Sequence, residues 1–370
     1  MKFSCTQENL NRGLALVTHI TGKNVNLPIL HNVLVEAKDN AITLSATNLE
    51  IGIRVRLRGK VDEAGSFTVP AQVFASYVGL VSAEKVDVER ADDGLNIQAG
   101  NQNTKIKGEE ATEFPMIPEV VLENPISVPA SELKMALAQT IVAVSHDDSR
   151  PELTGVYTQI EDHRVVFAAT DSYRLAERAL PIAGTHTERQ IIVPGMAMQE
   201  LVRVLPDDAG VDVRMYFSDS QALFMTDEVE ITTRLIEGNY PDYRQIIPME
   251  EKTKAVVDRY DLVKAVKAAS LFSKSGIHDV NLQFSPDKQG VTLTTVNNQV
   301  GENVSKVNAE IVGDSNSIIF NHRYLLDGVQ QVSTPQVVFY VVDGVSPGII
   351  RPHGGDTASQ YTYIIMPIKQ

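Results

Sequence analysis

The sequence predicts an α+β protein in which one unit of antiparallel sheet and two helices is used three times. Three observations support this: a strand-then-helix pattern that occurs three times, a second helical pattern at the same spacing, and a short β-type run at one place in each copy. Self-similarity at a fixed period means that one fold is repeated. The repetition bounds the function more tightly than any single residue does.

The first pattern joins an apolar β-type run to an amphipathic helical stripe. The runs end at Pro70, Pro194 and Asn321, which lie 124 (194−70) and 127 (321−194) residues apart. Apolar residues follow at identical offsets in the three copies, namely Phe74, Val78 and Val81, then Met198, Val202 and Leu205, then Leu325, Val329 and Val332. Since residues at this spacing share one helix face, each copy is expected to place a helix directly after a strand.

A second helix is expected in each copy, over residues 6–20, 129–144 and 258–272. Each of these segments carries a leading apolar pair one turn apart: Leu10 and Leu14, Leu133 and Leu137, Leu262 and Val266. The pairs lie 123 (133−10) and 129 (262−133) residues apart, which matches the first pattern. Thr6 and Asp258 suit the N-cap position, and Pro129 suits a first helical turn.

Short β-branched or alternating runs lie between the helices, at ITLSAT (42–47), VVFAAT (165–170) and VTLTTV (291–296). Turn signals such as Lys38-Asp39-Asn40 separate the runs, so strands are expected to outnumber helices by about eight to two in each unit. Each unit is expected to pack its two helices on one face of a sheet. Polar stretches near 123–125 and 249–252 favour boundaries there, giving units over residues 1–124, 125–251 and 252–370.

The composition is that of a chain with large aliphatic cores. With 370 residues, of which 43% are apolar, it can bury a core in each of three units of ~120 residues. No apolar run reaches the ~20 residues that cross a bilayer, and MKFSCTQENL lacks a signal core. The single Cys5 excludes an internal disulfide and a cysteine zinc cluster. These features favour a soluble cytoplasmic protein that does not bind membranes.

Recognisable catalytic motifs are missing. The sequence holds no GxxxxGK[ST], GxGxxG, HExxH, GxSxG or CxxC pattern. His146, Asp147 and Asp148 offer metal ligands, but a solvated loop after a helix is the better interpretation, since no second ligand cluster lies near them in the sequence. We therefore expect no catalytic residue, metal or cofactor, and keep a hydrolase that uses these three residues as an alternative.

The formal charge of −14 restricts how the chain can meet nucleic acid. An acidic surface keeps a protein dispersed. A protein that holds nucleic acid by neutralising phosphates is normally basic. Solubility is the favoured interpretation of this charge, and an outer surface that does not attract nucleic acid is the alternative.

Four segments in order resemble one known family. They are LPILHNVLVEA (27–37), ATDSYRLAER (169–178), GNYPDYRQIIP (238–248) and YIIMPIKQ (363–370). Together with the length and the triplication, they make the chain similar to the bacterial replicative sliding clamp, the DNA polymerase III beta subunit, from Met1 to Gln370. The resemblance implies a non-catalytic processivity factor: two protomers join head to tail into a closed ring of six units, helices line the hole, and duplex DNA threads it.

A closed ring reconciles the acidic charge with DNA, because topology rather than affinity retains it. Exposed charges are screened beyond about 8 Å at physiological salt. The resemblance points five positions toward DNA: Lys23, Asn24, Gln72, Arg150 and Arg203. Asn24 and Gln72 stand where other members carry arginine, which predicts weak direct contact. Basic residues agree with this inner face in part, namely Arg12, Lys134, Arg259, Lys264, Lys267 and Lys274, although an ordinary solvated helix face explains any one lysine better.

The resemblance also implies a groove between the second and third units that binds short linear motifs, typically glutamine followed by apolar residues. Its partners would be the clamp loader, replicative and other DNA polymerases, and repair proteins. The groove residues carried over are Leu153, Thr170, Ser172, Tyr173, Arg174, Leu175, Pro241, Gln245, Ile246, Ile277, Asn321, Tyr324, Val345, Ser346, Ile364, Met366, Pro367 and Ile368. A soft apolar groove of this kind suits about micromolar binding.

The same family packs its protomers through two apolar surfaces. Leu271 and Phe272 would lie on one, and Thr104 and Ile106 on the other, with burial in the chain's own core as the alternative. A two-fold axis closes such a head-to-tail contact into a ring. The alternative function from another class is a triplicated oligomeric binding scaffold that does not act on DNA.

Overall fold

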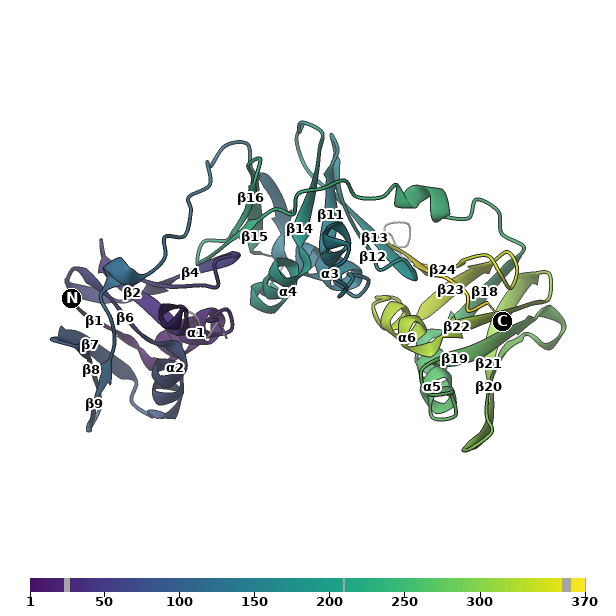
Figure 1. Ribbon diagram of the computed structural model, residues 1–370, viewed down its shortest axis with the longest axis horizontal. Helices are drawn as coiled ribbons and strands as arrows, with labels where there is room; N and C mark the ends of the chain where they lie inside the picture. Colours follow the sequence, from purple (N-terminus) through teal and green to yellow (C-terminus); the bar gives the residue numbers. More distant parts are fainter. Residues whose placement is uncertain (23–26, 209, 355–360, 370) are drawn as a thin grey trace. The chain divides into compact units, whose positions relative to one another are not determined.

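The computed structural model describes residues 1–22, 27–208, 210–354 and 361–369. The chain forms two compact units, one made of Met1–Ala130 and Asp208–Leu235, the other of Ser131–Asp207 and Ile236–Gln370. Antiparallel sheets and helix pairs make up both units (Figure 1). The α+β class that the sequence predicts is confirmed.

Three helices contain the leading apolar pairs: α1 (Gln7–Thr18), α3 (Ala130–Ile141) and α5 (Arg259–Ser270). The predicted caps are confirmed, since Thr6 Oγ1 accepts a hydrogen bond from Asn9 N at 3.3 Å and Asp258 Oδ1 accepts one from Asp261 N at 3.0 Å. The prediction for Pro129 was wrong. This proline still pairs with Asp212 as the last residue of a strand, so the helix begins one residue later.

The other three helices are α2 (Ala71–Leu80), α4 (Gly195–Val204) and α6 (His322–Gln330). Their N-caps are Pro70, Pro194 and Asn321, as the repeated pattern predicts. In α4 the apolar face is shifted slightly, because Leu201 is buried while Val202 is only half-buried. Within their units, α1 lies beside α2 and α5 beside α6, each pair against sheet strands (Figure 1).

Two sheets belong to the first unit. The five-stranded sheet has the order β5 (Lys60–Glu63), β1 (Lys2–Thr6), β7 (Lys85–Ala91), β8 (Gly94–Ala99), β9 (Gln102–Lys107). The eight-stranded sheet has the order β10 (Ile126–Pro129), β15 (Asp212–Phe217), β16 (Gln221–Met225), β17 (Val229–Arg234), β4 (Ile51–Arg58), β3 (Ala41–Thr47), β2 (Asn32–Lys38), β6 (Gly65–Pro70).

A twelve-stranded sheet runs through the second unit. Its order is β14 (Arg189–Pro194), β11 (Gly155–Ile160), β12 (Arg164–Thr170), β13 (Arg174–Pro181), β25 (Tyr361–Ile365), β24 (Gly348–Pro352), β23 (Gln336–Val341), β18 (Thr253–Asp258), β21 (Gly301–Gly313), β20 (Gly290–Asn297), β19 (Asp279–Ser285), β22 (Asn316–Asn321).

Successive repeats are joined by strand pairing. The strand that follows the recurring β-type run in one repeat pairs with the last strand of the next repeat. In the first unit this is β4 with β17, where Ile53 faces Ile231, and in the second unit it is β13 with β25, where Ala176 faces Tyr363. Each junction thereby satisfies the backbone groups of two sheet edges. Searched over the described ranges, none of the helices is long and apolar enough to cross a bilayer.

Candidate functional site

The candidate site is built around the turn that joins β12 to β13. Asp171 Oδ1 accepts hydrogen bonds from the backbone N–H groups of Tyr173 and Arg174, both at 3.0 Å. Thr170 Oγ1 accepts one from Ser172 N at 3.1 Å. Ser172 has a φ of 74°, a left-handed conformation that a non-glycine residue adopts only when its surroundings hold it there. The turn therefore presents Ser172 and Tyr173 to solvent in a fixed geometry.

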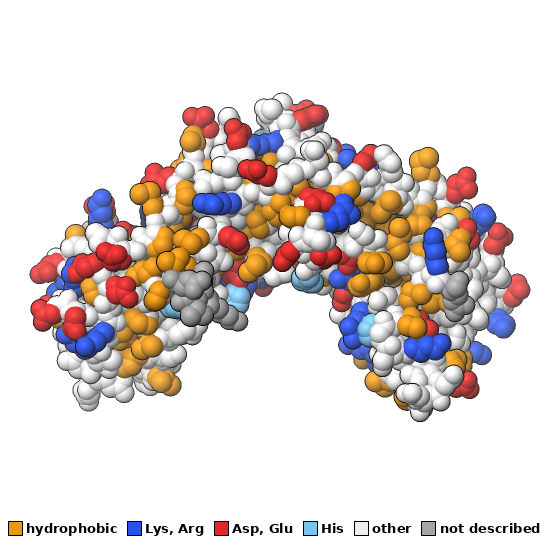
Figure 2. All heavy atoms as spheres, in the orientation of Figure 1, with side chains coloured by type: hydrophobic (Ala, Val, Ile, Leu, Met, Phe, Trp, Pro, Cys, Tyr) orange, Lys and Arg blue, Asp and Glu red, His pale blue; other side chains and the backbone are white. Residues whose placement is uncertain are grey.

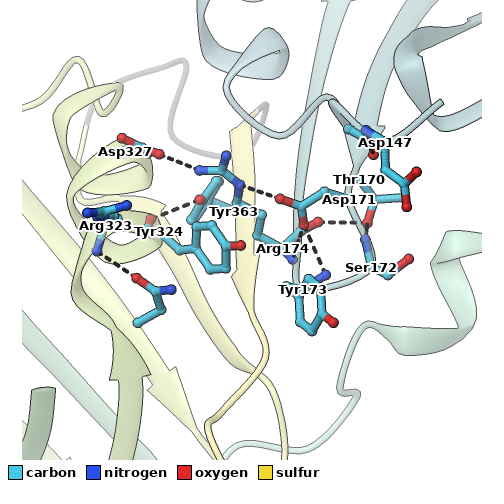
Figure 3. A network of polar contacts seen from close by, with 12 residues as sticks. Asp147, Thr170, Asp171, Ser172, Tyr173, Arg174, Arg323, Tyr324, Asp327 and Tyr363 are labelled. Atoms are coloured by element: carbon cyan, nitrogen blue, oxygen red, sulfur yellow. Dashed lines mark hydrogen bonds and ion pairs between the residues drawn. The ribbon is translucent and has the colours of Figure 1, made fainter. Parts of the chain in front are cut away.

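Arg174 ties this turn to α6 (Figure 3). Its guanidinium donates to Asp171 Oδ2 at 2.9 Å and to Asp327, and it lies 4.4 Å from the centre of the Tyr324 ring. The side chain is only 9% exposed, so the two carboxylates supply the charge compensation that a buried cation needs. Tyr173 and Tyr324 stack with ring centres 6.4 Å apart, one on each side of the junction.

An apolar cluster supports the turn from below. It consists of the buried residues Tyr157, Ala168, Leu175, Tyr243, Ile349 and Ile364, with Tyr240, Ile247 and Tyr340 packed against it. Tyr240 Oη accepts a hydrogen bond from Thr170 N at 3.0 Å, which fixes the chain after β17 against the end of β12. Burial raises the pKa of Tyr240, so its hydroxyl stays protonated at neutral pH.

The last described residues of the chain run along the same turn. Met366 N donates to Tyr173 O at 2.9 Å, and Ile368 N donates to Ile319 O on β22 at 2.8 Å. Met366, Pro367 and Ile368 are half-buried, which leaves part of each available to a ligand. The turn, the tail and α6 thus form one surface of mixed aromatic and aliphatic character.

The structure joins some of the predicted groove residues directly. The contacts above connect Thr170, Ser172, Tyr173, Arg174, Leu175, Tyr324, Ile364 and Met366. Leu153 is buried, whereas Ile246, Ile277 and Val345 are exposed at 36%, 49% and 66%. Asn321 caps α6 by accepting from Arg323 N, Gln245 donates to Asp242, and Ser346 N donates to Asp343. Pro241 is half-buried.

Sequence reasoning missed three residues that hold the site together: Asp327, Tyr363 and Tyr240. Tyr363 Oη donates to Tyr324 O at 2.9 Å and so locks β25 to α6. A signal for Asp327 was present, because Tyr324 and Asp327 lie three residues apart and share one helix face. A strand arginine surrounded by apolar residues, such as Arg174, needs a carboxylate of that kind.

The residues expected to face DNA differ in their surroundings. Lys23 and Asn24 lie outside the described residues. Gln72 is exposed on α2. Arg150 Nε lies 3.0 Å from Glu152 Oε1, and Arg203 Nε lies 2.9 Å from Glu200 Oε2, so both cations are already paired with carboxylates. Their net attraction for phosphate is correspondingly reduced.

In the orientation of Figure 2, some of the lysine and arginine side chains lie on the surface around α5 and α6. Lys264 and Lys267 are exposed on α5, and Lys264 Nζ lies 4.2 Å from the centre of the Tyr260 ring. On the first helices of the other repeats the basic residues are paired, Arg12 with Glu228 at 2.9 Å and Lys134 with Asp207 at 2.8 Å.

The four residues expected at a protomer interface are only partly on the surface. Leu271 is 73% exposed at the end of α5, and Phe272 is half-buried beside it. Ile106 is 5% exposed and packs inside its own unit, while its neighbour Thr104 is half-buried. Both lie on β9, which is the edge strand of its sheet.

The acidic loop at 146–148 has a local explanation. His146, Asp147 and Asp148 are all exposed. Asp147 Oδ1 accepts a hydrogen bond from Ser149 N at 2.9 Å, and this bond lowers the pKa of Asp147. Over the residues that the structure describes, no group of three or more His, Cys, Asp or Glu side chains has a geometry that could hold a metal ion.

Comparisons with known proteins agree along the whole chain. Models of the DNA polymerase III beta subunit match as the N-terminal domain over residues 1–118, the central domain over 127–242 and the C-terminal domain over 244–369. The Beta sliding clamp of Synechococcus elongatus is 30% identical, over 100% of this chain and 99% of that protein. The crystal structure of the Bacillus subtilis sliding clamp has a TM-score of 0.93 at 25% identity, covering 100% of this chain and 99% of that one. A Pseudomonas aeruginosa sliding clamp has the same TM-score at 26% identity, with 100% of both chains covered.

Proposed function

The chain belongs to the DNA polymerase III beta subunit family, the sliding clamps, and we propose that it closes around duplex DNA as a head-to-tail dimer. The chain is a DNA sliding clamp. The members of this family are processivity factors rather than catalytic subunits. The observation that supports the dimer is the strand pairing that joins repeat to repeat. Within the described residues it occurs twice and leaves one matching pair of edges unpaired.

Those two edges belong to β21 and β9. Residues 301–308 of β21 follow the recurring β-type run of the third repeat, and across the described ranges they pair only with β20. Strand β9 ends the first repeat and pairs only with β8 within the described residues. They are the counterparts of the strands that pair at the other two junctions. An unpaired sheet edge can pair with another strand, and a second copy of the chain would supply the strand that matches it.

The register of this pairing follows from the two junctions inside the chain. Ile53 and Ala176 occupy the position of Asn303, because their partners are the fifth residues of the recurring runs. Ile231 and Tyr363 occupy the position of Thr104. In all three repeats this position is reached by the same steps across the sheet from the strand that precedes the repeat's first helix. Asn303 would then face Thr104 of the partner subunit, and Glu302 would face Lys105 of the partner subunit. Opposite charges in facing positions stabilise antiparallel pairs.

Exposed apolar side chains flank the free edge of β21. Leu271, Val296, Val300 and Val304 are 73%, 52%, 62% and 58% exposed. Such a cluster, at the end of α5 and on the β20–β21 hairpin, is typical of a protein–protein interface. Ile106 would contribute through the backbone of β9 rather than through its buried side chain.

Encirclement explains how a chain of charge −14 can work on DNA. Retention by a closed ring needs few phosphate contacts, and weak contacts permit sliding. The exposed Lys264 and Lys267 on α5 would supply short-range contacts, as would Lys23, Asn24, Gln72, Arg150 and Arg203 where they face the duplex.

The surface around Tyr173, Tyr324 and Met366 is our candidate for binding short linear motifs. Its half-buried methionine and stacked tyrosines suit an apolar ligand of variable shape. The partners would be the clamp loader, replicative and other DNA polymerases, and repair proteins in the cytoplasm. We keep the three clamp domains at 1–124, 125–251 and 252–370, supported by the spacing of the repeated strand–helix pattern.

The decisive experiment compares retention on circular and linear DNA. Clamp loaded onto nicked circular plasmid should stay bound after a salt challenge and leave when the plasmid is linearised. An oligomeric scaffold that does not act on DNA would release both forms at the same rate, and that result would overturn the proposal.

A further inference from the structure

The turn before β4 has the same hydrogen bonds as the turn at the candidate groove. Thr47 Oγ1 donates to Ile51 O at 2.9 Å and accepts from Leu49 N at 3.0 Å. Asn48 Oδ1 accepts from Glu50 N at 3.0 Å and from Ile51 N at 2.8 Å. Leu49 has a φ of 78°, close to the 74° of Ser172 at the equivalent position 123 residues later (172−49).

The strand that lies beside this turn also matches. Arg234 N donates to Glu50 O at 3.2 Å, just as Met366 N donates to Tyr173 O at 2.9 Å at the groove. Both bonds extend the pairing of a repeat junction, β4 with β17 in one case and β13 with β25 in the other. The first unit therefore contains a second copy of the backbone frame on which the groove is built.

A cavity of about 240 Å³ opens on this second frame. Ile51 and Thr233 are buried at its base, while Leu49 and Met116 stand at its lip with 45% and 91% exposure. Residues 116–118 line one side of the cavity. Ile117 fixes this segment, because its carbonyl oxygen accepts a hydrogen bond from Arg54 Nη2 at 2.8 Å. Pockets for drug-sized molecules are larger, about 300–1,000 Å³, so this one suits a single side chain of a peptide.

The charges at the rim distinguish this site from the groove. Glu50 and Arg234 stand where the groove has Tyr173 and Met366. Both are exposed, and within the described ranges neither has an ion-pair partner. Arg234 can bind a ligand carboxylate through two parallel hydrogen bonds, which Met366 at the equivalent position of the groove cannot do. The rim is therefore better suited to an acidic ligand than to the glutamine motif.

We propose that this depression is a second peptide site, which takes an extended segment of a partner protein carrying one apolar side chain and a carboxylate two residues later. In an extended chain these two side chains point to the same face. The apolar one would enter between Leu49 and Met116, and the carboxylate would pair with Arg234. The inference rests on the proposed motif binding at Tyr173, because it assumes that the equivalent backbone frame in the first unit also binds a peptide.

The test uses full-length protein labelled at its methionine methyl groups. The first probe is a nine-residue peptide of serine and glycine with a central leucine and a glutamate two positions later. We expect it to shift the Met116 methyl resonance and leave Met366 unmoved. Replacing the glutamate by lysine, or introducing Arg234→Glu, should weaken binding roughly fivefold. Arg214→Glu, a reversal on β15 of the same sheet, should leave it unchanged.

The second probe, a glutamine–apolar peptide, reports on the groove in the same spectra through Met366. If Met366 responds to the second probe while Met116 ignores the first, the further inference fails and the proposed function stands. Equal binding of the glutamate and lysine peptides also overturns the inference. If Met366 does not respond, the motif groove itself is refuted.

Discussion

Arg174 on β13 donates a hydrogen bond to Asp327 on α6, and the two residues are 153 positions apart in the chain. Asp171 holds the same guanidinium from the other side. The pair joins the second repeat to the third at the place where the Tyr173 turn, Tyr324 and the chain's last residues meet. The candidate groove therefore depends on an ion pair that belongs to neither repeat alone.

Replacing Asp327 by asparagine should destabilise the second unit. The buried Arg174 would keep Asp171 but lose one of its two carboxylates, which costs about 1–3 kcal/mol of the free energy of unfolding. Denaturant unfolding measures this directly. Asp227→Asn is the matched control, because its pair with Arg214 is exposed and should matter by less than about 1 kcal/mol. An equal effect of the two variants would contradict the role given to Asp327.

Alanine substitutions in the C-terminal tail should weaken motif binding without unfolding the protein. Met366 and Pro367 are half-buried, and their replacement by alanine removes apolar surface from the groove. A fluorescent peptide of the QLxLF type should bind roughly thirtyfold more weakly, since two lost contacts at about 1 kcal/mol each make about 2 kcal/mol. Met249→Ala, at a fully exposed position, serves as the control. Unchanged affinity in the double variant would mean that Met366 and Pro367 do not line the groove.

Local patterns predicted local structure well. Thr6, Asp258 and Asn321 cap helices because a capping side chain needs only the next three residues, and these are adjacent in the sequence. The fixed offsets after Pro70 and Pro194 likewise report one helix face. All of this is decided within a few turns of chain.

Long-range pairing was not accessible in the same way. The residues near Arg174 in the sequence do not indicate that Asp327 is its partner. Likewise, the residues near Ile106 do not indicate that its side chain lies in the core of its own unit. At Pro129 the signal was ambiguous, because proline suits both the end of a strand and the start of a helix, and pairing with Asp212 decided between them. Sheet neighbours settle such choices.

Stability should fall between pH 7 and pH 5 through His322. Its Nδ1 is buried with no hydrogen-bond partner among the described residues. Burial first, then His278 and Arg323 nearby, lower the pKa of His322, while Asp279 opposes them. The unfolded chain therefore takes up the proton before the folded one does. The stabilisation is fully present above the usual histidine pKa of about 6.5 and is lost as the pH falls through the lowered folded pKa.

Urea unfolding at several pH values measures this effect. His322→Gln should flatten the dependence between pH 7 and pH 5, while His146→Gln, at an exposed position, should keep it. If both variants follow the parent protein, His322 does not carry the dependence.

Charge at the apolar end of α5 should break the dimer. Leu271 is 73% exposed and Phe272 lies beside it, so aspartate at both positions places two charges where the partner subunit would pack. Light scattering should then report monomers that unfold like the parent. Met196→Asp on α4 is the control, because Met196 is 60% exposed and lies in the second repeat, which contributes no strand to the proposed interface. A persistent dimer would remove Leu271 and Phe272 from the interface.

The strand register at that interface makes a sharper prediction. Glu302 of one protomer should face Lys105 of the partner subunit, so Glu302→Lys alone places like charges opposite each other and weakens the dimer. Lys105 also pairs with Asp93 at 2.6 Å in its own chain, so Lys105→Glu should cost more than the mirror change. The double variant restores opposite charges across the two strands and should recover dimer affinity relative to Lys105→Glu. Sedimentation equilibrium measures all three. Additive losses in the double variant would mean that the two residues do not meet, and that the third junction does not copy the register of the first two.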